Sequence, residues 1–171
     1  MTRDLGILII RVLFGAAMAA HGSQKLFGWF GGHGLKGVGG VFEQVGFRPG
    51  VPFAALAGLS EAGGGILLAL GFFTPFGSAA VLAAMLVAIF SVHVRNGFFA
   101  MSNGFELPFL YAVAAVALAF TGAGAFSLDS LFGLSFLTDP VLVNMVLLLA
   151  AVGAKATLAL RKQDQKQTSA A

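Results

Sequence analysis

Six ionisable residues of this 171-residue chain lie inside or at the ends of long apolar stretches, where their chemistry could serve a buried site. Arginine and lysine can offer positive charge to a substrate, and carboxylates and imidazoles can pass protons between water and the membrane interior. The sequence has no phosphate-binding loop, zinc-protease motif or nucleophile elbow beside them. The candidate pocket or proton site therefore consists of Arg11, His21, Lys25, Glu61, His93 and Glu106.

The order of the apolar stretches predicts that most of these residues meet near one membrane face. The first stretch ends at His21 and Lys25, and the second starts from that same side. The third returns there with His93 and Arg95, and the fourth departs from there at Glu106. Only the first four stretches define this cluster, so it does not depend on how the fifth is placed.

Glu61 and Arg11 lie deeper in their stretches. At 1.5 Å per helical residue, Glu61 is about 14 Å and Arg11 roughly 20 Å from that face. A charge in lipid is costly unless it is paired, so the sequence predicts an Arg11–Glu61 ion pair. The pair fits a purely structural role as well as a ligand or proton site.

Five apolar stretches position these groups, and each approaches the ~20 residues with which a helix crosses a hydrocarbon layer. We predict an all-α fold, a polytopic membrane helical bundle with a four-helix core and a fifth, C-terminal span in one domain over 1–160. In the alternative four-span arrangement, the last stretch lies on the membrane surface. The predicted spans cover residues 5–21, 52–71, 75–94, 107–122 and 141–160.

Three segments outside the spans carry their own expectations. The Gly-rich segment 22–50 is predicted to be a partly ordered interfacial loop with a short helix around 38–45. Ser127 and Asp129 are predicted to begin a short apolar segment as its cap. Residues 161–171 are predicted to form a basic, disordered cytoplasmic tail.

Composition excludes several classes of protein. Hydrophobic residues make up 58% of the chain and charged residues only 10%, which is too apolar for a water-soluble domain. The net charge of +3 is too small and too dispersed for a nucleic-acid-binding surface. The absence of cysteine excludes thiol chemistry and thiolate metal sites in this chain, and we expect no metal site.

Arg11 interrupts the first apolar stretch, so we expect a retained helix rather than a cleaved signal peptide.

Lys and Arg residues are distributed unevenly between the two predicted faces. With five spans, seven of them fall on the face that carries the C-terminus and only Arg3 falls on the other. The positive-inside rule therefore predicts an external N-terminus and a cytoplasmic C-terminus.

An ordered series of motifs resembles the DoxX-like family of integral membrane proteins. The series covers about residues 1–132 and is more specific than any one of its parts. It comprises RxxxG at 11–15, HGxxKLF at 21–27, ExGGG at 61–65, LALG at 68–71, His93 with Asn96, NGFELP at 103–108 and TGxGxFSLD at 121–129.

The resemblance implies an integral membrane protein associated with oxidoreductase systems. Members of the family that this chain resembles include the membrane subunit of a thiosulfate:quinone oxidoreductase. Another member is linked to superoxide dismutase and a sulfurtransferase in thiol-stress defence. Because this chain has no cysteine, the resemblance favours quinone chemistry or partner-mediated redox chemistry over direct thiol exchange.

Our hypothesis is a bacterial inner-membrane component of an oxidoreductase system, with a pocket for a quinone-type or other small molecule and with soluble or membrane redox partners. Whether the chain is itself catalytic, and whether it forms homo-oligomers, stays open at this point. A proton-coupled or small-solute transporter and a membrane scaffold for soluble redox enzymes are the alternatives. Two histidines near one face also allow a b-type haem, a minor alternative because single histidines near interfaces are common.

Overall fold

The computed structural model describes residues 1–162, which fold into helices and contain no strand. The predicted all-α class is confirmed. Five short 3₁₀ or π segments lie at Trp29–Gly31, Ile89–His93, Val94–Asn96, Ala100–Ser102 and Ser135–Thr138. The α-helices are α1 (Thr2–Phe27), α2 (Gly34–Gln44), α3 (Gly50–Leu70), α4 (Thr74–Ala88), α5 (Glu106–Thr121), α6 (Leu128–Leu131) and α7 (Pro140–Ala159).

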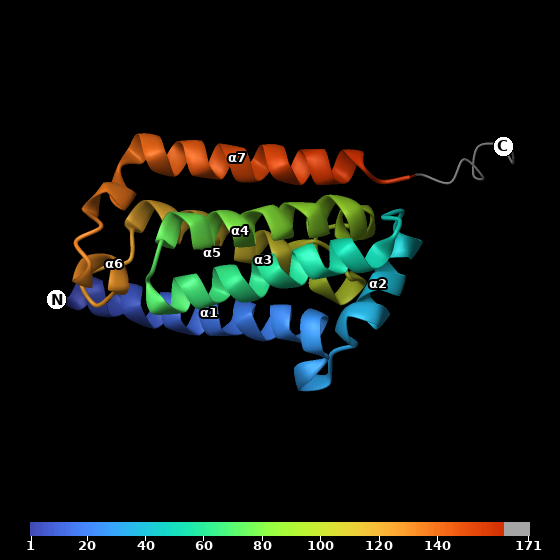
Figure 1. Cartoon of the computed structure of the whole chain (residues 1–171), viewed down its shortest axis with the longest axis horizontal. Helices are drawn as coiled ribbons and strands as arrows, with labels where there is room; N and C mark the ends of the chain where they lie inside the picture. The colour runs from blue at the N-terminus through green and yellow to red at the C-terminus, as the bar shows by residue number, and fades with distance from the viewer. Residues whose placement is uncertain (163–171) are drawn as a thin grey trace, which may run out of the picture.

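The five long helices lie side by side along the long axis of the molecule and alternate in direction (Figure 1). The N-terminus, the α3–α4 turn and α6 lie at one end, called here the α6 end. Helix α2 and the C-terminal end of α7 lie at the other, called here the α2 end. Helix α1 therefore starts at the α6 end, and α7 finishes at the opposite, α2 end.

Four helices are long and apolar enough to cross a membrane: α1, α3, α7 and the continuous helix from Thr74 to Asn96 that begins with α4. Helix α5 is apolar but has only 16 residues, or about 24 Å at 1.5 Å per residue. Helix α7 is aligned with the other long helices (Figure 1) and packs on α4. Its direction matches the predicted fifth span rather than a helix lying across the bundle on the membrane surface.

The segment predicted to be a loop after residue 21 is largely helical. Helix α1 continues to Phe27 and ends at Gly28, which has a left-handed backbone with φ of +73°. Helix α2, at Gly34–Gln44, starts before the predicted short helix. Glycine usually weakens a helix, yet Gly22 lies inside α1 because it is buried against α3. Tertiary packing therefore outweighs local propensity here.

Helices α1 and α3 pack backbone against backbone. A Cβ atom on Gly15 would lie 2.5 Å from the amide nitrogen of Ala69 and from the carbonyl oxygen of Gly65. A Cβ atom on Gly22 would lie 2.5 Å from the carbonyl oxygen of Gly58. Small residues allow such a close approach between membrane helices and thereby fix their register.

An apolar core fills the middle of the bundle and receives side chains from all five long helices. It separates the polar groups of the α2 end from those of the α6 end. Its buried members are Met18, Leu68, Val81, Leu82, Met85, Ala112, Ala115, Leu118, Ala119, Val143 and Leu147.

The first two residues of the predicted disordered tail are bound to the bundle. Arg161 Nε donates to the carbonyl oxygen of Val45 at 2.8 Å, and the amide of Lys162 donates to the carbonyl oxygen of Gly46 at 2.8 Å. The tail prediction is corrected for these two residues, because the α2–α3 loop offers unpaired carbonyls beside the end of α7. Residues 163–171 lie outside the described part.

Replacing Gly15 by Ala should destabilise the protein by about 1–3 kcal/mol, because the added methyl group forces α1 and α3 apart. The thermal unfolding midpoint in a single detergent measures this loss. Gly63→Ala is the matched control, because a Cβ on Gly63 meets no atom within 4 Å. Alanine is the better helix former, so the control should be neutral or stabilising. Equal midpoints for the two variants would refute the close packing.

Candidate functional site

Glu61 of α3 and Lys25 in the last turn of α1 form a buried ion pair. Lys25 Nζ donates to Glu61 Oε2. The side chain of Glu61 is only 4% exposed and that of Lys25 is 27% exposed. A carboxylate buried this deeply requires a paired or hydrogen-bonded partner, and Lys25 provides it.

The predicted Arg11–Glu61 ion pair is wrong. Gly15 packs against Ala69, so Arg11, one turn earlier on α1, lies beside the C-terminal end of α3. Glu61 is two turns away from Ala69 and faces Lys25 instead. The glycine contacts, which the sequence does not reveal, set the register between the two helices.

The guanidinium of Arg11 binds backbone carbonyls. Its Nε donates to Ala123 at 3.1 Å and its Nη1 to Leu68 at 3.4 Å and to Ala69, while its Nη2 donates to Phe126. Leu68 and Ala69 belong to the last turn of α3, whose carbonyls have no partner within the helix. Arg11 is 2% exposed and ties α1, α3 and the loop before α6 together. These contacts give it a structural role.

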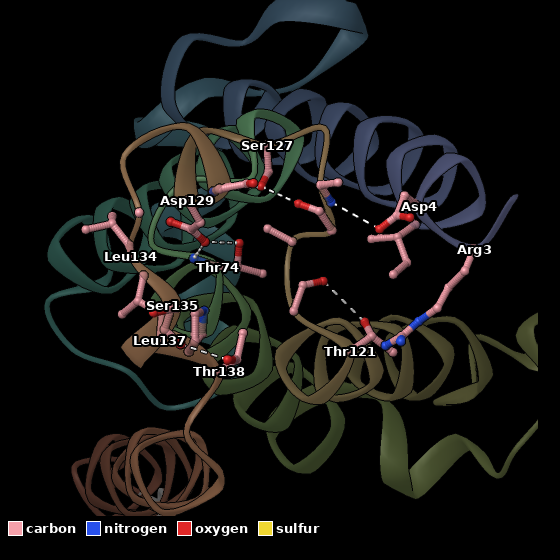
Figure 2. Close-up of a pocket in the computed structure, with 18 residues that line it drawn as sticks. Arg3, Asp4, Thr74, Thr121, Ser127, Asp129, Leu134, Ser135, Leu137 and Thr138 are labelled. Carbon is pink, nitrogen blue, oxygen red and sulfur yellow. Dashed lines mark hydrogen bonds between the residues drawn. The ribbon is translucent and has the colours of Figure 1, made fainter. Parts of the chain in front are cut away.

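Asp129 caps the start of α4, as Arg11 caps the end of α3. Its Oδ1 accepts from the amide of Phe73 at 2.7 Å, and its Oδ2 accepts from the amide of Thr74 at 3.1 Å and from the Thr74 hydroxyl at 2.7 Å. Asp129 and Thr74 line a polar cavity of about 350 Å³ at the α6 end (Figure 2). There Asp4 accepts from the amide of Ala125 at 3.2 Å. The sequence identified Asp129 only as a cap of the following segment.

A small cavity of about 220 Å³ at the α2 end gathers four of the six predicted residues. His21, Lys25, Glu61 and His93 line it, as the order of the helices predicts. Tyr111 of α5 completes its polar lining, with its ring centroid 5.8 Å from that of His21. The cavity thus combines imidazole, ammonium, carboxylate and phenol groups.

A large cavity of about 480 Å³ lies on the other side of the ion pair. Apolar side chains of α2, α3, α4 and α7 form most of its wall. Its hydroxyl groups come from Ser60, Ser91 and Thr157. Lys25, Glu61 and His93 line both cavities, so these three groups form the boundary between the small cavity, which holds several polar groups, and the large, mostly apolar one.

His93 ends the π-helical segment that follows α4. Such segments widen one turn of a helix and are frequent at functional sites. The Nδ1 atom of His93 lies 2.9 Å from the carbonyl oxygen of Asn103. A carbonyl oxygen can only accept, so Nδ1 carries the proton of the neutral ring and Nε2 is left as an acceptor.

Glu106 does not line either of the two cavities at the α2 end. Its Oε2 accepts from the amide of Ala100 at 2.8 Å and thereby braces the turn between the third and fourth long helices. In the same turn, the carbonyl oxygen of Asn103 accepts a hydrogen bond from Asn96 Nδ2 at 3.2 Å. Of the six predicted residues, Glu106 and Arg11 therefore lie outside the shared boundary.

Sequence reasoning missed Tyr111, Ser60 and Ser91 as lining residues. Tyr111 is the only tyrosine of the chain and stands in an apolar stretch, which was a usable signal. Ser91 carried no comparable signal, because its position depends on the π-helical turn. Its hydroxyl donates to the carbonyl of Val87 at 2.6 Å.

The arrangement can bind a partly apolar molecule and exchange protons with its polar end. Lys25 supplies positive charge, and Glu61 and the Nε2 atom of His93 can accept protons. Within residues 1–162, no group of three or more His, Asp and Glu side chains could hold a metal ion.

Fold and composition define a polytopic helical membrane protein with a polar site near one end of the bundle. The family model described as DoxX matches residues 6–94, just over half of the chain. The chain belongs to the DoxX family. No solved structure matches it.

Two proteins of Haemophilus influenzae, both described only as uncharacterized, are similar to this chain. One is 41% identical over 86 residues, which cover 48% of this chain and 64% of the relative. The other is 37% identical over 65 residues, which cover 38% of this chain and 43% of the relative. The chain thus spans less than two thirds of the length of either curated relative.

A double-mutant cycle on stability tests the corrected pairing. Lys25→Met and Glu61→Gln should couple by about 0.5–3 kcal/mol, because each removes one partner of the same ion pair. Arg11→Met and Glu61→Gln should be additive within about 0.5 kcal/mol. Unfolding free energies in mixed detergent give both cycles. Strong coupling between Arg11 and Glu61 would restore the original pairing.

Proposed function

We propose that this DoxX protein is a component of an oxidoreductase system in the bacterial inner membrane and binds a quinone-type molecule in the large cavity. The observation that carries the proposal is an apolar cavity that ends at a buried ion pair and a histidine. A quinone is likewise apolar over most of its surface and polar at a few atoms, since its ring and tail are apolar and its two carbonyl oxygens need hydrogen-bond donors.

The size and lining of the large cavity support this ligand. Its volume of about 480 Å³ falls within the roughly 300–1,000 Å³ typical of small-molecule sites. Such sites are largely apolar, with a few polar groups that orient the ligand. Here Lys25 Nζ can donate to a quinone carbonyl, and Ser60 offers a further hydroxyl donor on the wall.

Reduction of a quinone to a quinol takes up two electrons and two protons. The electrons would come from a redox partner protein, soluble or in the membrane. Glu61 and His93 can pass protons to the two quinone oxygens, and the positive charge of Lys25 stabilises a reduced, anionic intermediate. The small cavity, with His21 and Tyr111, provides a polar approach to these groups from the α2 end.

No observation in the described residues favours the transport alternative. The polar cavity at the α6 end and the two cavities at the α2 end are separated by the apolar core. Arg11, at the α6 end, has its guanidinium occupied by backbone carbonyls. The scaffold alternative is compatible with a quinone site, because redox partners would dock on the outside of the bundle.

Purified protein should bind decylubiquinone, and Glu61→Gln and His93→Ala should each weaken binding by about tenfold, because the first removes the carboxylate that holds the Lys25 ammonium in place and the second removes the imidazole at the polar end of the cavity. Equilibrium dialysis in detergent measures the affinity. Failure of the wild-type protein to bind any quinone analogue would refute the proposed function.

Two further variants test which cavity is occupied. Gly153 of α7 lines the large cavity and has open space around it, so Gly153→Phe should fill the cavity and abolish binding. Gly63→Phe places the same side chain in open space away from the cavity and should leave binding unchanged. Equal affinities for these two variants would place the quinone elsewhere.

A further inference from the structure

Three cationic residues gather at the α2 end beyond the large cavity: Arg95, Arg161 and Lys162, called here the basic cluster. Arg95 lies in the 3₁₀ turn that ends the third long helix, and Arg161 and Lys162 follow α7. No side-chain carboxylate among residues 1–162 forms an ion pair with any of the three. Within the part of the chain that the structure describes, no ion pair therefore offsets the positive charge of the cluster.

The guanidinium of Arg161 is held in place by three neighbours. Its Nε donates to the carbonyl of Val45 at 2.8 Å, and its Nη1 lies 3.4 Å from the carbonyl oxygen of Phe90. Its Cζ lies 5.7 Å from the centroid of the Phe47 ring. A guanidinium has five N–H donors, so most of them remain for another acceptor. Arg161 is thus an oriented donor group rather than a mobile surface side chain.

Arg95 lies close enough to Arg161 to affect its ionisation. Burial lowers the pKa of Arg161, and the positive charge of Arg95 lowers it further. Phe90, which accepts from Arg161, is five residues before Arg95 in the same helical segment. The two cations repel each other, and an anion between them would remove this repulsion.

The basic cluster adjoins the mouth of the large cavity. Val45, which accepts from Arg161, lines that cavity, and so does Thr157, one turn before Arg161 on α7. Phe90 directly precedes Ser91, another lining residue. Oriented cations therefore stand beside an apolar surface, at the face that the excess of Lys and Arg predicts to be cytoplasmic.

We propose that the basic cluster is a binding site for the phosphate of an anionic phospholipid, seated between Arg161 and Arg95 with its acyl chains along the apolar surface of α2 and α7. Basic pockets between membrane helices on the cytoplasmic side bind such headgroups. Arginine is well suited to them, because its planar fork can donate two hydrogen bonds to one phosphate.

A membrane lipid is the source we favour over free phosphate, because the cluster lies beside apolar surface at a membrane face. Free phosphate would gain nothing from the apolar walls of α2 and α7. The proposal is independent of the quinone site, since it concerns the rim of the large cavity and not the ion pair at its inner end.

Native mass spectrometry with titrated lipid tests the site. The wild-type protein should retain phosphatidylglycerol in preference to phosphatidylcholine, and inorganic phosphate should not displace it. Arg95→Gln should weaken phosphatidylglycerol binding by about fivefold, the effect of one cation at a membrane surface. The side chain of Arg95 makes no hydrogen bond or ion pair within residues 1–162, so this variant should fold normally. Arg161→Gln should weaken binding at least as much.

Lys36→Gln is the matched control, because Lys36 is exposed on α2 at the same end of the bundle but lies outside the cluster. It should leave lipid binding unchanged. Equal retention of the two lipids, displacement by phosphate, or equal losses for Lys36→Gln and Arg95→Gln would overturn the proposal. The last result would mean general attraction to the surface rather than a site.

Discussion

The close packing of α1 on α3 is the contact on which the other features depend. Gly15 and Gly22 meet the backbone of α3 at Gly65 and Gly58, and no larger side chain fits between the helices. This register brings Lys25 to Glu61 in one half of the bundle. In the other half it brings Arg11 to the carbonyls of Leu68 and Ala69 at the end of α3. The packing of one helix pair therefore gives each buried charge a partner.

The two ends of the bundle use charge for different purposes. At the α6 end, Arg11 and Asp129 cap the facing ends of α3 and α4, so the polar groups hold the helix turn together. At the α2 end, Lys25, Glu61 and His93 stand between two cavities and have capacity for a ligand. The apolar core between the ends keeps these roles separate and confines the proposed chemistry to one side of the membrane.

The clustering of His21, Lys25 and His93 near one face could be predicted from the sequence, because it follows from the number of helices and their alternating direction. The partner of Glu61 could not. Depth along a helix estimates which residues are level, but side-chain pairing also needs the rotation and register of each helix. The partner of Glu106 could not be predicted either, because its carboxylate accepts a hydrogen bond from the backbone of the adjacent turn.

Hydrophobicity alone determined that the chain is a helical membrane bundle, since apolar stretches of this length must satisfy their backbone hydrogen bonds within helices. The motif series determined the family, which the family model confirms. Only the tertiary structure decided that Arg11 caps a helix and that Lys25 pairs with Glu61. The physical reason is that glycines set helix register through contacts between residues more than thirty positions apart. The sequence shows small residues at helical spacing, but it does not show which of them meet.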